Sequence, residues 1–349
     1  MSLLQNNITR SKLFSIAKYI LLLGIAFFLL VFAFKGINVN NVLAEIRKAK
    51  ILWVLFSALF SVIALVSRAY RWNLLIEPLG YNPPLKKTTY ALMIGYFANL
   101  ALPRLGEVSR CGALSKAESI PFNKLFGTVI IERVVDVISL FICVLLAAII
   151  EYNRLGNFLT KNIIDPMTEK FQKILQSPVA ITITIIIVAG LFIGILYYLR
   201  KTKRKGSESK VTNLIKGIVD GLRSIANLKR PWLFLLHSVI IWVLYYLGVY
   251  IALFAFSFTS NLGASAALFL LVAGGIGMSA PVQGGIGAYH LFVSQGLVLY
   301  GVQKEDGLAF ATMLHGLQLL LIIIFGLISL FLLFSARKNK QVNSVSMKT

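Results

Sequence analysis

Long apolar runs separated by short polar connections dominate the sequence. Six of these runs supply the approximately 20 apolar residues that a membrane-spanning helix needs. They cover residues 13–34, 51–76, 125–150, 179–199, 231–256 and 308–334. The pattern therefore predicts an all-helical (all-α) polytopic membrane protein with about six full transmembrane helices.

Two further apolar segments are interrupted, and both interruptions carry the motif Pro-x-x-Gly. In residues 88–116, Pro103 removes a backbone donor and Gly106 adds a flexible point. The corresponding interruption in residues 264–300 contains Pro281, Gly284, Gly285 and Gly287. We expect each segment to be a re-entrant broken helical hairpin with its tip near the middle of the membrane, although residues 264–300 are long enough to be two full spans instead.

Each half of the chain then has the order span, span, hairpin, span, and the two halves have opposite orientations. This is the pattern of inverted-topology repeats in transporters, where broken helices mark the binding site. The predicted organisation is a first repeat in residues 1–150, an extracytoplasmic linker in 151–178, a second repeat in 179–334, and a polar, disordered tail in 335–349. The second repeat includes a basic loop, residues 200–230, with an amphipathic helix at the membrane surface.

Basic residues are in large excess and indicate the orientation. The chain of 349 residues has 35 Lys and Arg against 13 Asp and Glu, a formal net charge of +22. Because the basic residues lie between apolar spans, they indicate cytoplasmic loops and not a nucleic-acid-binding surface. With the loop 200–230 inside and the short loops 257–263 and 301–307 outside, we expect a multi-pass protein of the inner (plasma) membrane with both termini cytoplasmic.

Charged residues beside the first interruption are the main candidates for a binding site. Arg104, Glu107 and Arg110 follow Pro103, and Asn99 precedes it. At membrane depth, charge and irregular backbone persist only inside protein or beside a water-filled cavity. A guanidinium group suits phosphate through its planar fork, and helix N-termini at the interruptions would offer N–H groups to an anion.

A second charged group lies near the start of the span 125–150. Glu132, Arg133 and Asp136 are spaced so that they share a helix face. Two interpretations stay open: an ion cluster at the membrane interface, or a buried site that pairs with the charges near Pro103. Arg68 and Arg71, at the end of the second span, are interpreted as interfacial anchors that could contact lipid headgroups.

The three histidines each lie alone on an apolar segment, without metal-ligand spacing. His237, His290 and His315 are expected to be hydrogen-bonded packing residues, with His290 also a candidate headgroup contact. Ser279 lies in a sequence that weakly resembles the Gly-x-Ser-Gly of intramembrane serine proteases, but Ala280 replaces the final glycine. No nucleotide-binding motif occurs, so we expect no cofactor and no metal.

Several short motifs carry a resemblance to a known family. In order, they are Arg68-Ala-Tyr-Arg-Trp72, Gly95-Tyr-Phe-Ala-Asn99, Pro103-Arg-Leu-Gly-Glu107 with Arg110, Glu132-Arg133 with Asp136, and Pro281-Val-Gln-Gly-Gly-Ile-Gly287. This set resembles the flippase-like transmembrane family, the membrane region of lysylphosphatidylglycerol synthase and its stand-alone relatives, over residues 13–334. The resemblance implies a lipid translocator or a membrane component of lipid modification. It does not imply aminoacyl transfer, and His290 stands where the family often has an acid.

The residues and the resemblance together predict a translocator that moves an amphipathic, anionic lipid between leaflets by alternating access. Its expected partners are membrane lipids, anionic phospholipid above all, with a lipid-modifying enzyme as a further candidate. One alternative is an intramembrane enzyme or membrane subunit for headgroup modification that uses Glu107, Glu132 or His290. A small-solute carrier is the third.

Overall fold

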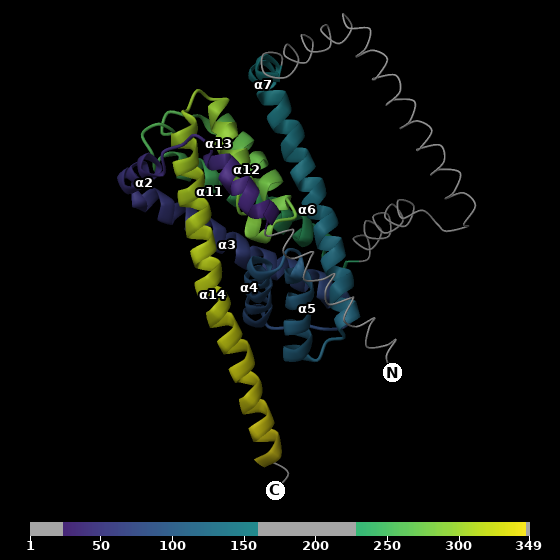
Figure 1. Ribbon diagram of the computed structural model, residues 1–349. Helices are drawn as coiled ribbons and strands as arrows, with labels where there is room; N and C mark the ends of the chain where they lie inside the picture. Colours follow the sequence, from purple (N-terminus) through teal and green to yellow (C-terminus); the bar gives the residue numbers. More distant parts are fainter. Residues whose placement is uncertain (1–23, 160–227, 347–349) are drawn as a thin grey trace, which may run out of the picture. The chain divides into compact units, whose positions relative to one another are not determined.

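The structure, a computed structural model, describes residues 24–159 and 228–346 of the chain (Figure 1). These residues form helices and contain no strand. Four of the described helices are long and apolar enough to cross a membrane, and a bent helix pair would make a fifth. The predicted all-helical, polytopic class is therefore confirmed. The predicted span 179–199 and almost all of the basic loop 200–230 lie outside the described residues.

The chain divides into two compact units. One comprises Met1–Ala147 with Ile225–Thr349, and the other Ala148–Ser224. The described helices are α2 (Val39–Lys48), α3 (Ile51–Ile76), η1 (Glu77–Leu79), α4 (Leu85–Ala101), α5 (Leu105–Glu118), α6 (Phe122–Ile150), α7 (Tyr152–Leu159), α11 (Pro231–Leu253), α12 (Ala264–Ser279), η3 (Gln283–Gly285), α13 (Ala288–Val298) and α14 (Lys304–Ser346), with a helix Gly24–Phe34 before α2. The boundaries of the predicted repeats stay a prediction, because compactness does not report internal symmetry.

The helices α3 and α11 pack side by side in opposite directions. At one end of the pair, the Lys50 N–H donates to the Ala255 carbonyl at 2.8 Å. At the other end, the Arg230 guanidinium donates to the Glu77 carboxylate at 2.7 Å. These helices are the second spans of the two predicted repeats, and an antiparallel pair is what inverted repeats require of them.

The predicted first hairpin consists of α4 and α5, joined through a break at residues 102–104. Lys87 and Glu118 form an ion pair at the open end of this first hairpin. Near the tip, Gly95 and Gly106 let the two backbones touch, since a Cβ added at Gly95 would lie 2.8 Å from the Gly106 carbonyl oxygen. Small residues permit this approach, as they do between membrane helices generally.

The predicted second hairpin consists of α12 and α13, joined through a break at residues 280–287. The helices have 16 and 11 residues. At 1.5 Å per residue they extend about 24 and 17 Å, less than the roughly 30 Å of a bilayer core. The lengths favour a hairpin over two full spans for residues 264–300.

The two hairpins contact different parts of α14. Near its start, Leu308 clusters with Val42 of α2. One to two turns further on, the ring of His315 contacts the Gly284 carbonyl in the second break. Near the middle of α14, Gly326 packs on Phe97 of α4. The second hairpin therefore lies against the first half of α14 and the first hairpin against its second half, as the arrangement of these helices in Figure 1 also shows.

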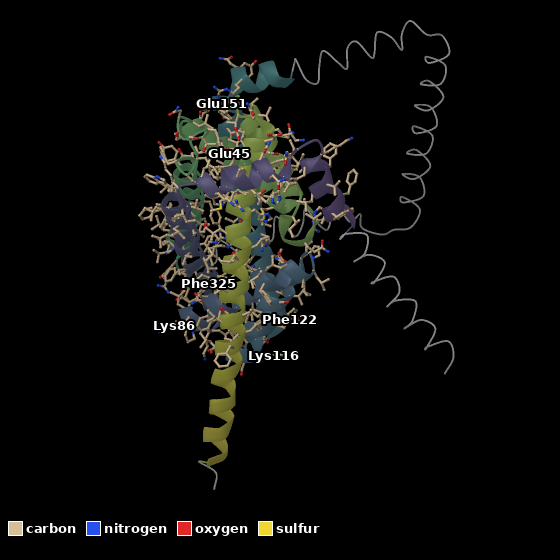
Figure 2. All side chains as sticks on the ribbon, turned by 60° about the vertical axis from the view of Figure 1, so that its left-hand side comes forward. Glu45, Lys86, Lys116, Phe122, Glu151 and Phe325 are labelled. Carbon is tan, nitrogen blue, oxygen red and sulfur yellow. The ribbon has the colours of Figure 1, made fainter. Side chains whose placement is uncertain are left out.

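The two breaks meet between these contacts. A Cβ added at Gly284 would lie 2.9 Å from the side chain of Leu100, in the last turn of α4 before Pro103. The open end of the first hairpin points away from this meeting point: Figure 2 shows Lys86 and Lys116 at the end opposite Glu45 of α2. The hairpins thus approach each other tip to tip from opposite ends of α14.

One expectation about the C-terminus is wrong. Residues 335–349 were expected to be a disordered tail, whereas α14 continues to Ser346. The physical reason is that residues 335–346 contain neither proline nor glycine, so nothing stops a helix that is already nucleated from propagating. At the other end of the described chain, α2 makes an angle of 81° with the helix that precedes it.

Candidate functional site

The centre of the candidate site is the carboxylate of Glu132 on α6, which has no exposed side-chain surface. Its Oε1 accepts from Arg68 of α3 at 3.0 Å and from Arg71 of α3 at 3.1 Å. Its Oε2 lies 2.9 Å from Arg110 of α5, as an ion pair without hydrogen-bond alignment. One buried acid thus joins three helices.

Asp136 lies one turn along α6 from Glu132 and engages the same two arginines of α3. Its oxygens accept from Arg68 at 2.9 Å and from Arg71 at 2.7 Å. One further donor of each guanidinium group reaches a hydroxyl of α11: Arg68 donates to Tyr245 and Arg71 to Ser238, each at 3.3 Å. Charge-assisted bonds of this kind are the strong ones in a buried setting.

Glu107 of the first hairpin pairs with α6. Its carboxylate lies 3.1 Å from the guanidinium of Arg133, which is also 3.8 Å from Asp136. The side chains of Arg133 and Glu107 are 40% and 23% exposed, so this is the open side of the cluster. The seven residues form what we call the charge network: Arg68, Arg71, Glu107, Arg110, Glu132, Arg133 and Asp136.

The charge network has four guanidinium groups and three carboxylates, which leaves an excess of one positive charge among these residues. The donors are also not all used. The buried Nε atoms of Arg68, Arg71, Arg110 and Arg133 have no hydrogen-bond acceptor within the described part of the chain. A buried donor without an acceptor is costly, so the network has both the charge and the free donors to hold an anion.

Packing keeps the network in place. Trp72, fully buried on α3, donates from Nε1 to Thr128 at 2.8 Å. The guanidinium of Arg110 lies over the same indole, 4.7 Å from the ring centroid. A cation over a tryptophan face is attracted by the ring quadrupole, so Trp72 fixes α3, α5 and α6 around one point.

These contacts favour the second interpretation of Glu132, Arg133 and Asp136, because Glu132 is fully buried and the group pairs with Arg110 and Glu107 beside the first break. The interpretation of Arg68 and Arg71 as interfacial anchors is wrong. Arg71 has no exposed surface and Arg68 only 7%. Both are held by acids of α6.

The first break presents Arg104 outside the network. Arg104 is exposed, and its φ of +64° is in the left-handed region that non-glycine residues rarely adopt. Beside it, the N–H of Gly106 donates to the side chain of Asn99 at 2.7 Å. Asn99 therefore accepts from one of the N–H groups at the start of α5 that were expected to be free for an anion. The exposed cationic group at this break is the guanidinium of Arg104.

The second break is built from glycines and is more enclosed. Gly284, Gly285 and Gly287 have positive φ values of +56°, +77° and +81°. Gly287 packs on the helix Gly24–Phe34, because a Cβ there would lie 2.6 Å from the Leu30 nitrogen. The N-terminus of α13 is therefore covered in this structure. Pro281 is exposed, while His290 is buried, with 7% of its surface exposed.

Comparison with known proteins assigns the family. The sequence profile described as lysylphosphatidylglycerol synthase TM region matches residues 19–326. The chain belongs to this family. The matched residues include both hairpins, the charge network and the described membrane helices as far as Gly326 in α14, and the family is one of multi-pass membrane proteins.

Two curated relatives of the family are archaeal. A UPF0104 membrane protein of Methanocaldococcus jannaschii is 29% identical over 124 residues, which are 35% of this chain and 37% of the relative. A UPF0104 membrane protein of Pyrococcus horikoshii is 29% identical over 135 residues, 37% of this chain and 40% of the relative. The chain thus matches less than half the length of either. No solved structure shows significant similarity to it.

Sequence reasoning missed two members of the site. Tyr245 and Ser238 of α11 accept hydrogen bonds from Arg68 and Arg71. Neither has a charged neighbour in sequence that would have singled it out. Their helical spacing on apolar spans was visible, but their partners are far away along the chain.

Proposed function

We propose that this protein moves an anionic lipid between membrane leaflets by alternating access, with phosphate as the recognised group. The observation that carries the proposal is the buried charge network, with its excess positive charge, beside two helix breaks that meet tip to tip. Intramembrane charges of this kind are expensive and mark substrate pathways. Discontinuous helices that meet near one level are the usual setting of a transporter's binding site.

Arg104 is the group proposed to meet the lipid phosphate first. It is exposed at the first break, and within the described residues no carboxylate forms an ion pair with it. Phosphate would then pass to the free donors of Arg133, which pairs with the partly exposed Glu107, and of Arg110, which lies on the same helix as Glu107. Arginine suits this role because its fork binds two phosphate oxygens at once.

The enzyme alternative has less support from the geometry. A general base needs a free oxygen or nitrogen within reach of a substrate proton. Glu132 is enclosed by three guanidinium groups, and Glu107 is paired with Arg133. A role as the membrane subunit of a lipid-modifying enzyme, acting through a partner, is compatible with the same transport step.

The test uses the full chain in proteoliposomes with fluorescent phosphatidylglycerol or phosphatidylcholine as a tracer, and dithionite added outside to quench the outer leaflet. Wild type is expected to move the anionic tracer faster than the zwitterionic one. Arg104→Ala should abolish this movement, and Arg104→Lys should restore it only in part.

The matched control is Lys86→Ala, an exposed cation at the other end of the same hairpin (Figure 2), and it should move lipid as wild type does. Normal movement by Arg104→Ala would refute the assignment of Arg104. A chemically altered tracer recovered from the vesicles would favour the enzyme instead.

A further inference from the structure

Two histidines that the proposed site does not use lie together beside the second break. His290 is the third residue of α13, and His315 lies on α14 with no exposed surface. Their ring centroids are 5.1 Å apart. Aromatic side chains lie beside both histidines. The ring centroid of Tyr289 is 4.9 Å from that of His315, and the ring centroid of Phe34 is 6.3 Å from that of His290. We call His290 and His315 the histidine pair.

The hydrogen bonding of the pair leaves two nitrogens free. Nε2 of His315 lies 2.8 Å from the carbonyl oxygen of Gly284. A carbonyl only accepts, so Nε2 carries the proton and Nδ1 of the neutral ring keeps a lone pair. Nδ1 of His315 and Nδ1 of His290 are both buried without a hydrogen-bond partner in the described part of the chain. Each ring can therefore take up one proton without losing an existing bond.

The pair is suited to a single proton. Imidazole is the side chain whose charge ordinarily changes between about pH 5 and 8. Two buried imidazoles about 5 Å apart disfavour a second charge, so such a pair titrates as one unit. The titratable group beside the pair is the phenol of Tyr289, and no described acid or guanidinium is ion-paired with either ring. A proton on the pair would thus have no counter-charge while the break is closed.

The pair is also joined to the moving part of the proposed mechanism. Its contact partner Gly284 has a positive φ and packs on Leu100 at the end of α4. The neighbouring Gln283 is 4% exposed, and neither its amide oxygen nor its amide nitrogen has a partner in the described residues. Buried polar atoms without partners favour a second arrangement of this break in which water reaches them.

We infer that the histidine pair is a proton-binding site that couples lipid movement to a proton gradient. The lone pair of one Nδ1 binds H⁺ when the second break opens to water, and the same N–H bond breaks to release H⁺ to water on the other side of the cycle. The Nε2–H bond to Gly284 transmits the charge of the ring to the break that contacts the first hairpin. This inference rests on the proposed lipid movement.

The experiment measures how a pH gradient changes the steady distribution of a tracer lipid. Proteoliposomes contain the full chain, fluorescent phosphatidylglycerol and an internal pH dye, and K⁺ with valinomycin holds the voltage at zero. One proton moved per lipid predicts about a tenfold change in the leaflet ratio per pH unit, because one pH unit is a tenfold proton ratio. Either direction of the shift supports coupling.

The variants separate the pair from general effects of histidine. His315→Gln keeps an amide donor for Gly284 but cannot take up a proton, and His290→Phe keeps an aromatic ring in its aromatic surroundings. In both variants the leaflet ratio of the tracer should no longer change with the pH gradient, so that the tenfold change per pH unit falls to about onefold. The matched control is His237→Gln on α11, whose Nδ1 lies 2.9 Å from Ser67 Oγ, and it should keep the shift.

The outcomes distinguish this inference from the proposed function. A wild type that equilibrates the tracer equally with and without the gradient overturns the coupling and leaves lipid movement intact. Retention of the shift by either pair variant overturns the role of the histidine pair. A wild type that moves no lipid defeats the proposed function, and the coupling with it.

Discussion

Replacing Glu132 by glutamine should be the most destabilising isosteric change in the charge network. The carboxylate is fully buried and serves Arg68, Arg71 and Arg110. Asp136 can still compensate the two arginines of α3, but Arg110, which is 3% exposed, loses its only ion pair among the described residues. Stranding a buried charge costs about 3–5 kcal/mol, a large part of the roughly 5–15 kcal/mol by which domains are stable.

Glu107→Gln is the matched control for this magnitude. It removes the same charge from a neighbouring helix, but its pair with Arg133 is partly exposed on both sides. An exposed pair contributes only about 0–1 kcal/mol. The two substitutions should therefore differ by roughly 2–5 kcal/mol, taken as the difference between these two ranges.

The measurement is the loss of monodisperse protein on heating in detergent, followed by size-exclusion chromatography. Glu132→Gln should lose its native peak at a clearly lower temperature than Glu107→Gln. Adding Arg110→Gln to Glu132→Gln should lower stability by less than the sum of the two single changes, since the second change removes the stranded charge. Equal melting of Glu132→Gln and Glu107→Gln, or full additivity in the double variant, would refute the network as described.

Three further predictions follow from the packing and the orientation. Gly106→Val should disrupt the first hairpin, because a Cβ there would lie 2.6 Å from the Asn99 amide, while Gly112→Val, with open space around it, should not; equal recovery of folded protein would contradict this. Cysteines at Lys86 and at Glu45 should label from opposite sides of intact membranes, and labelling from one side would end the inverted-repeat prediction (Figure 2). Ser279→Ala should leave lipid movement near the wild-type rate, because the hydroxyl only donates to the Gly275 carbonyl; loss of movement by folded protein would revive the protease interpretation.

Local chemistry made much of the fold predictable. The apolar run 51–76 is bounded by Lys50 and Glu77, and α3 has those same limits. Proline marked both breaks, since it removes a donor and restricts the residue before it. The pairing of Glu107 with a basic residue of α6 was also predictable, because an unpaired charge at membrane depth has a high free-energy cost and therefore needs a partner.

The misses share a different cause. Arg68 and Arg71 end an apolar run beside Trp72, which is also the pattern of interfacial anchors. What distinguishes them is Glu132 on α6, 61 to 64 residues away along the chain. A single sequence does not show that residues so far apart along the chain are in contact in the folded protein. The histidine pair was missed for the same reason, because its two members lie on different helices.

The way both hairpins rest on α14 has a mechanical consequence. This helix is continuous from Lys304 to Ser346, and it holds the Gly284 carbonyl at His315 and the ring of Phe97 at Gly326. Eleven residues of helix, about 17 Å, separate these two contact points. A translation or rotation of α14 therefore displaces both contact points together. The two hairpins are therefore coupled through α14, and a movement of α14 that releases one hairpin also displaces the other.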